Sequence, residues 1–154
     1  MTITLRFVLL TAIGVLLASP CTTLSQPSQA TAEQYRPLKT IWTGVYTKGQ
    51  ATRGGQAYTQ VCVRCHRNDL SGGGKGHPLT GPSFFDRWHD LNLRDVFAYI
   101  QNSMPHDREV FVPADSARDI VSFLLEKNDV PAGNEALSKD IGTLGRILIT
   151  RPPK

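Results

Sequence analysis

Cysteine and methionine are scarce in this sequence, which has three cysteines and two methionines in 154 residues. A second Cys-x-x-Cys pair, which a four-ligand zinc site would need, is absent. Basic residues form no run with interleaved aromatics, and the net charge is only +4, so nothing indicates nucleic-acid binding. This length allows one domain and hardly a second.

The N-terminus has the pattern of a secretory signal peptide, which we predict to be residues 1–30. Arg6 is the single charge, and the apolar run at residues 7–17 is shorter than the roughly 20 residues of a membrane span. The small-x-small pattern at residues 28–30 favours cleavage after Ala30, and cleavage near Ala18 is an alternative. An uncleaved N-terminal anchor is the competing interpretation.

Cys21 follows the apolar run, where a lipid could be attached to a cysteine. Pro20 precedes it at a position where a small residue is expected, so lipidation is the lesser alternative. Cleavage after Ala30 would remove Cys21 and leave Cys62 and Cys65 as the only cysteines, without a disulfide framework.

Residues 62–66 read Cys-Val-Arg-Cys-His, the spacing of covalent c-type haem attachment. Two thiols three positions apart can reach two vinyl groups of one porphyrin. His66 can then offer an imidazole nitrogen to the iron. A thioredoxin-like redox pair is the alternative, but that motif should follow a strand, and the stretch before Cys62 reads as a helix.

Met104 is the candidate for the opposite axial position. It lies 38 positions beyond His66, directly before Pro105, and the only other methionine is in the leader. A thioether opposite an imidazole completes octahedral iron coordination and raises the reduction potential. The alternatives are a buried gap-filling methionine or a histidine ligand, with His106 as the main rival and His77 and His89 less favoured.

Three of the expected helices can be placed along the sequence. The segment 51–61 leads into the haem motif. A second helix starts after Asn92 as N-cap and ends near Ser103, and a third runs from Pro113 to Asn128. The second and third carry apolar residues at i, i+3, i+4 and i+7, which predicts one buried stripe on each: Leu93, Val96, Phe97 and Ile100, then Ala117, Ile120, Val121 and Leu124.

With these motifs, residues 41–147 resemble the class I c-type cytochromes. Gly54 and Tyr58 stand before Cys62 as in the first helix of that family, and Gly55 is a second candidate for the glycine. The resemblance implies that the glycine lets the last helix cross closely, with Ile120 and Phe123 meeting this face.

The resemblance also implies a proline whose carbonyl accepts the N–H of the haem histidine, which would orient the ring. Pro78 is favoured and Pro82 is the alternative. Phe84, Phe85 and Trp88 are expected to line the haem pocket or to pack in the core. The segment at Trp42 and Tyr46 is expected to cover apolar surface.

The fold class predicted is all-α, a cytochrome c fold with about four to five short helices around one covalently bound haem. The expected organisation is a signal peptide at 1–30, an N-terminal extension at 31–50, the cytochrome domain at 51–130, and a C-terminal extension at 131–154. The resemblance points to bacterial single-haem cytochromes that accompany periplasmic oxidoreductases.

The function predicted is electron transfer between periplasmic redox proteins rather than catalysis. The expected cofactor is haem c with its iron. The expected binding residues are Cys62, Cys65, His66, Met104 and Pro78, of which His66 and Met104 are expected to bind the metal. A dehydrogenase is the expected donor and an oxidase or another cytochrome the acceptor, with no membrane association beyond the leader. The alternative is a haem enzyme or gas sensor with an open sixth position.

Overall fold

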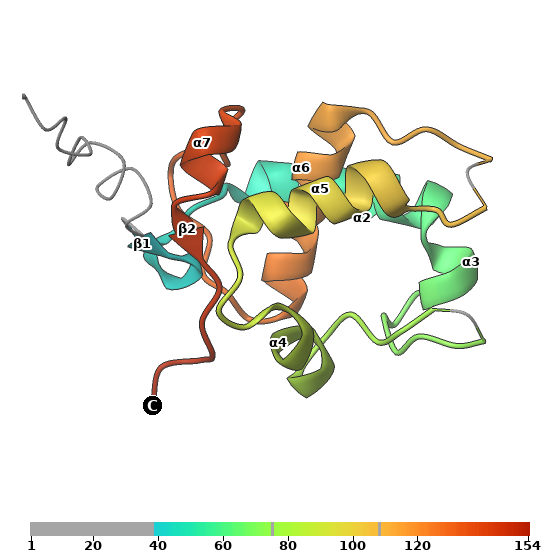
Figure 1. The fold of residues 1–154 in the computed structure, drawn as a ribbon, viewed down its shortest axis with the longest axis horizontal. Coiled ribbons are helices and arrows are strands. Elements are labelled where there is room, and N and C mark those ends of the chain that lie inside the picture. The colour runs from blue at the N-terminus through green and yellow to red at the C-terminus, as the bar shows by residue number, and fades with distance from the viewer. Residues whose placement is uncertain (1–38, 75, 108) are drawn as a thin grey trace, which may run out of the picture.

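The computed structural model describes residues 39–74, 76–107 and 109–154, so the predicted signal peptide and Cys21 lie outside the described residues. Within these ranges the chain is all-α, as predicted, with six α-helices, one 3-10 helix and two strands of two residues each (Figure 1). The elements are β1 (Lys39–Thr40), the 3-10 helix η1 (Ile41–Thr43), α2 (Lys48–Val61), α3 (Val63–His66), α4 (Pro82–Trp88), α5 (Leu93–Ser103), α6 (Ala114–Lys127), α7 (Ile141–Leu144) and β2 (Ile147–Leu148).

Helix α2 begins three residues before the predicted start because Thr47 caps it. The Gln50 N–H donates to Thr47 Oγ1, and the Thr47 N–H donates back to Gln50 Oε1, both at 3.3 Å. This reciprocal capping satisfies backbone donors that a helix N-terminus otherwise leaves unpaired. The helix then continues to Val61, where the turn that carries the two cysteines begins.

Helix α6 crosses α2 at Gly54. A Cβ on this residue would lie 1.8 Å from the backbone oxygen of Asp119, whereas one on Gly55 would lie 3.2 Å from the Phe123 ring. Gly54 is therefore the glycine at the crossing. Tyr58 and Phe123 pack beside it with ring centroids 5.2 Å apart. The predicted contact between the first and last helices is confirmed.

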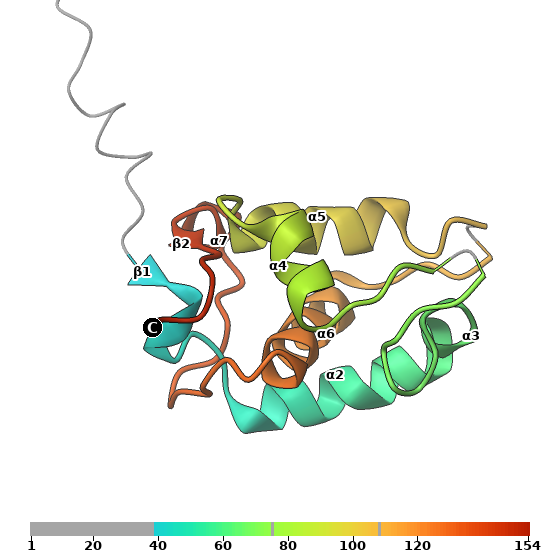
Figure 2. The ribbon, with the colours of Figure 1, turned by 90° about the horizontal axis from the view of Figure 1, so that it is seen from below.

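Helices α5 and α6 match their predicted ranges closely. Asn92 precedes α5, and its backbone N–H donates to Asp95 Oδ2 at 3.2 Å. Pro113 is the N-cap of α6 and Asn128 its C-cap. The two predicted apolar stripes are buried. Helix α6 packs against both α2 and α5, which lie on opposite sides of it (Figure 2).

The segments on either side of the central helices lie together at one end of the molecule. Strands β1 and β2 pair in parallel, with Lys39 opposite Ile147. Trp42 Nε1 donates to the Thr150 oxygen at 3.1 Å, and the buried Tyr46 donates its hydroxyl to the Val130 oxygen at 2.7 Å. The Trp42–Tyr46 segment thus enters the common core rather than only covering its surface.

No helix in the described ranges combines the length and the apolar character that crossing a bilayer requires.

Candidate haem site

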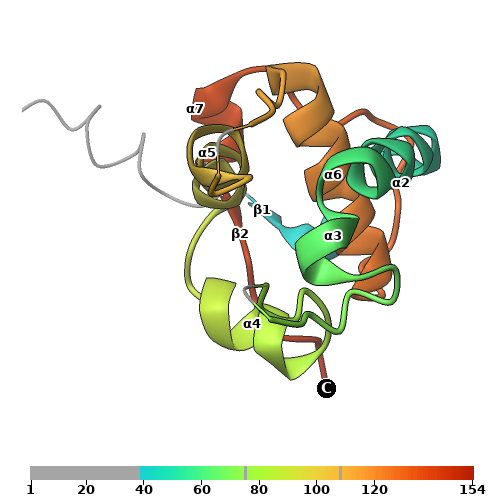
Figure 3. The same ribbon diagram turned by 90° about the vertical axis from the view of Figure 1, so that its right-hand side faces the viewer.

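A cavity of about 460 Å³ opens between the helices and the loop that follows α5. This volume lies in the range of small-molecule and cofactor sites. Each of the helices α2 to α6 contributes at least one lining side chain, and most of the lining is apolar. Viewed from the end of the molecule that carries α3, helix α5 lies to the left of α3, and α4 lies below both (Figure 3).

The two cysteines of the Cys-x-x-Cys-His motif line this cavity. Cys62 is both the C-cap of α2 and the N-cap of α3, and Cys65 lies within α3. Both thiols are free and partly buried. Burial, with a smaller contribution from Cys65, raises the pKa of Cys62 to about 11, so this thiol is protonated at neutral pH. The turn after the motif is held by Tyr58, whose hydroxyl donates to the Arg67 oxygen at 2.7 Å.

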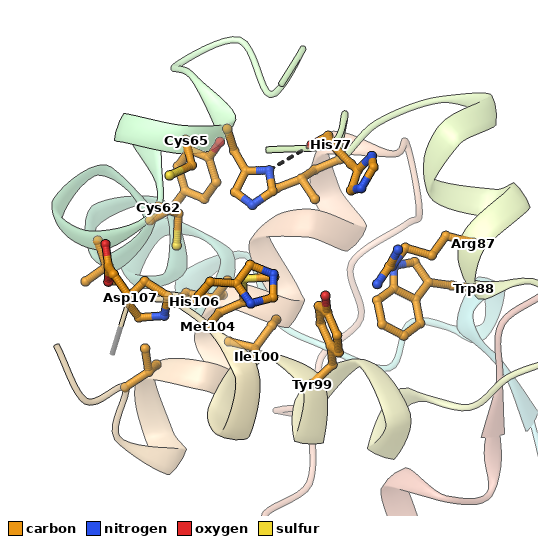
Figure 4. Close-up of a pocket in the computed structure, with 17 residues that line it drawn as sticks. Cys62, Cys65, His77, Arg87, Trp88, Tyr99, Ile100, Met104, His106 and Asp107 are labelled. Atoms are coloured by element: carbon orange, nitrogen blue, oxygen red, sulfur yellow. Dashed lines mark hydrogen bonds between the residues drawn. The ribbon is translucent and has the colours of Figure 1, made fainter. Parts of the chain in front are cut away.

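His66 also lines the cavity, and its Nδ1 lies 2.7 Å from the backbone oxygen of His77. A carbonyl oxygen can only accept, so Nδ1 carries the proton and Nε2 keeps its lone pair. The imidazole is therefore in the tautomer that can bind a metal through Nε2. Figure 4 shows this hydrogen bond as a dashed line ending at His77.

The acceptor differs from the prediction, which assigned this role to the carbonyl of Pro78 with Pro82 as the alternative. The loop passes so close to the motif that a Cβ on Gly76 would lie 2.2 Å from the Cys65 oxygen. That approach brings the carbonyl of His77, one residue earlier, to the imidazole. Pro82 is the first residue of α4.

Met104 lines the cavity from the end of α5, of which it is the C-cap. It lies across the cavity from Cys65 (Figure 4). His106 lines the same cavity and lies against Tyr99, with ring centroids 6.5 Å apart. His77 also reaches the cavity, whereas His89 does not line it and contacts Asp90 instead. Both Met104 and its main rival His106 are therefore within the site.

Arg87 and Tyr99 are lining residues that the sequence analysis did not single out. The Arg87 guanidinium lies over the rings of Trp88 and Tyr99, 5.2 and 4.8 Å from their centroids. A guanidinium at one end of an apolar cavity suits a carboxylate. The apolar periodicity did not indicate Tyr99, because this residue lies outside the apolar stripe of α5. Trp88 lines the cavity as expected, whereas Phe84 and Phe85 pack in the core.

The donors gathered here fit covalently held haem better than zinc. Two free thiols, a correctly protonated imidazole and a thioether surround an apolar cavity, as haem c requires. Among the side chains that the structure describes, no three His, Cys, Asp or Glu residues are grouped as a metal site would need.

Comparison with protein families agrees with this chemistry. Residues 49–124 match the family model described as "Cytochrome C oxidase, cbb3-type, subunit III", from the first turn of α2 to near the end of α6. This chain is a monohaem c-type cytochrome. Haem c is therefore its cofactor, and haem-based electron transfer with redox proteins is its general function. The predicted family and cofactor are confirmed.

A solved structure, "Crystal Structure of the Sulfane Dehydrogenase SoxCD from Paracoccus pantotrophus", is similar to this cytochrome with a TM-score of 0.44 and 18% sequence identity. The match covers 80% of this chain and 64% of that chain, so the cytochrome spans less than two thirds of its length. No curated protein matches the sequence.

Proposed function

We propose that this cytochrome is a single-electron carrier whose iron is bound by His66 and Met104, with haem attached through Cys62 and Cys65. Bound haem supplies an iron that gains and loses one electron. An imidazole and a thioether that both stay in place allow this with little rearrangement and leave no position for oxygen or peroxide.

The observation that carries the proposal is that the Cys-x-x-Cys-His motif and Met104, 38 residues further along the chain, line the same cavity. The α2–α3 turn brings the two thiols and the imidazole, and the end of α5 brings Met104 from the other side. The His77 carbonyl holds the imidazole so that Nε2 is the available nitrogen. A methionine that only filled space in the core would not need to face the His66 imidazole across a cavity.

We further propose that the protein works in the periplasm, after export directed by residues 1–30. A quinoprotein or another periplasmic dehydrogenase is the proposed donor, and a terminal oxidase or another cytochrome is the proposed acceptor. The family description names an oxidase subunit, which is compatible with a free carrier or an electron-transfer subunit. Residues 51–130 are the proposed cytochrome domain, with extensions at 31–50 and 131–154.

The test compares Met104→Ala with His106→Ala in the ferric holoprotein. Wild type is expected to be low-spin with the weak far-red sulfur-to-iron band. Met104→Ala should keep its haem, lose that band, bind cyanide readily and have a lower reduction potential, because the thioether is gone. Visible spectra and an optical redox titration measure all of these.

His106→Ala should keep both the band and the wild-type potential. Loss of the low-spin spectrum in His106→Ala, with Met104→Ala unchanged, would make His106 the ligand. A high-spin wild-type spectrum that shifts readily with cyanide would instead favour the enzyme or gas sensor with an open sixth position.

A further inference from the structure

Arg64 is one of the two variable residues of the Cys-x-x-Cys-His motif, and its side chain reaches across to the loop after α5. Its Nη1 donates to Glu109 Oε2 at 3.0 Å, and its Nη2 donates to Asp107 Oδ2. Asp107 lines the haem cavity three residues beyond Met104 (Figure 4). One guanidinium therefore joins the helix that carries His66 to the loop that follows Met104.

The two carboxylates form an ordered acceptor for this guanidinium. The Glu109 N–H donates to Asp107 Oδ1 at 3.3 Å, which holds the two acidic residues together. A planar guanidinium can donate to both carboxylates at once, which an ammonium group does less well. The hydrogen bond to Glu109 and the charge of Asp107 raise the pKa of Arg64 above its ordinary value.

The other ion pairs of residues 39–74, 76–107 and 109–154 lie elsewhere. Arg53 pairs with Asp119 between α2 and α6, and Arg151 pairs with Asp86 near the C-terminus. Those formed by Arg64 are the only ones in these ranges that join α3 to the loop after α5. Separating α3 from this loop therefore requires breaking the Arg64 contacts.

We propose that Arg64, with Asp107 and Glu109, is a positioning clamp that keeps the Met104 loop closed over the haem. This inference rests on the proposed role of Met104 as iron ligand. Exogenous ligands can bind the iron only when Met104 moves away, and the clamp opposes that movement. Arg64 thus controls access to the sixth position without touching it.

The expected effect is modest and sensitive to salt. Roughly half of the Arg64 and Asp107 side-chain surfaces are exposed, at 47% and 42%, and solvent screens such pairs. Loss of two such pairs is expected to change an opening equilibrium about three- to tenfold. The Debye length falls to about 3 Å at 1 M salt. The affinity of the wild-type protein for an exogenous ligand should therefore approach that of a protein without the Arg64 contacts as salt is raised.

The experiment is an imidazole titration of ferric holoprotein, with thermal unfolding measured in parallel. Arg64→Gln and the double variant Asp107→Asn with Glu109→Gln should each bind imidazole about three- to tenfold more tightly at low salt. Their far-red band should still be present without imidazole. Arg64→Lys should bind imidazole with an affinity between those of the wild type and of Arg64→Gln. The double variant leaves the haem-attachment motif intact, so it tests the clamp even if Arg64→Gln matures poorly.

Arg53→Gln is the matched control, since it removes an exposed arginine that also binds a carboxylate through two hydrogen bonds, away from the cavity. It should lower thermal stability while leaving imidazole affinity unchanged. Equal imidazole affinity in wild type and both clamp variants would overturn the inference while leaving the electron-carrier proposal intact. A wild-type protein without the far-red band would overturn both.

Discussion

His66 shows how one hydrogen bond defines the chemistry of a side chain. Its Nδ1 donates to the His77 carbonyl, so the lone pair of the ring is on Nε2. The Cys-x-x-Cys-His motif was readable in the sequence because its function depends on the spacing of neighbouring residues. The acceptor of the imidazole N–H was not, because it depends on the path of the glycine-rich loop.

At the same scale, Cys62 and Cys65 are expected to be indispensable for keeping the haem. Changing both to alanine removes the two thioether bonds, so exported protein should contain almost no stably bound haem. A haem stain of the reduced, denatured chain on a gel measures this, and Met104→Ala is the control that should remain stained. Recovery of normal amounts of coloured, folded double variant would contradict covalent attachment through these thiols.

At the scale of elements, the α2–α6 crossing holds the cytochrome together. The resemblance to class I c-type cytochromes at Gly54 and Tyr58 implied that these helices meet. The sequence put Gly54 first and left the adjoining Gly55 as a second candidate. The backbone contact between Gly54 and Asp119 distinguishes them.

Gly54→Ala and Gly55→Ala should therefore differ strongly in stability. A Cβ at Gly54 overlaps backbone atoms that cannot move aside, so unfolding free energy should fall by about 3 kcal/mol or more. A Cβ at Gly55 meets only the Phe123 ring, and alanine is favoured over glycine in a helix, so the change should be within about 1 kcal/mol. Urea denaturation of the holoproteins measures both changes in unfolding free energy. Similar losses in the two variants would show that α2 and α6 can move apart at little cost to make room for a Cβ at Gly54.

At the scale of the whole molecule, residues 39–50 of the N-terminal extension pack together with the C-terminal extension. Strands β1 and β2 and helix α7 lie at the same end (Figure 1). Trp42 is hydrogen-bonded to Thr150, and α7 and β2 each contribute buried side chains. Gly44 and Gly133 let the two segments approach, since a Cβ on Gly133 would lie 2.0 Å from the Gly44 oxygen. The C-terminal extension is thus part of the core.

A chain that ends at Arg146 should be markedly less stable than the full chain. It loses the buried side chains of Ile147 and Ile149, each worth about 1.5–3 kcal/mol when fully buried, so a loss of roughly 3–6 kcal/mol is expected. A chain that ends at Arg151 loses only exposed residues and is the control. Thermal or urea unfolding followed at the haem band measures the difference. Equal stability of the two truncated proteins would show that residues 147–151 contribute little to the core.

The amino-acid sequence by itself determined the features that depend on local spacing. These are the thiol–thiol–imidazole motif, the apolar stripes of α5 and α6, and the starts of these helices at Asn92 and Pro113. The resemblance to a family, and the cofactor it implies, rest on the same local motifs. Periodicity and motif spacing are properties of neighbouring residues, so they can be read without knowing the fold.

Only the tertiary structure decided which distant groups meet. The His77 carbonyl at His66, the Arg64 contacts to Asp107 and Glu109, and the joining of the two extensions all link segments separated by a loop or by most of the chain. Each contact depends on how the helices pack, because loop paths follow from close approaches such as those at Gly54 and Gly76.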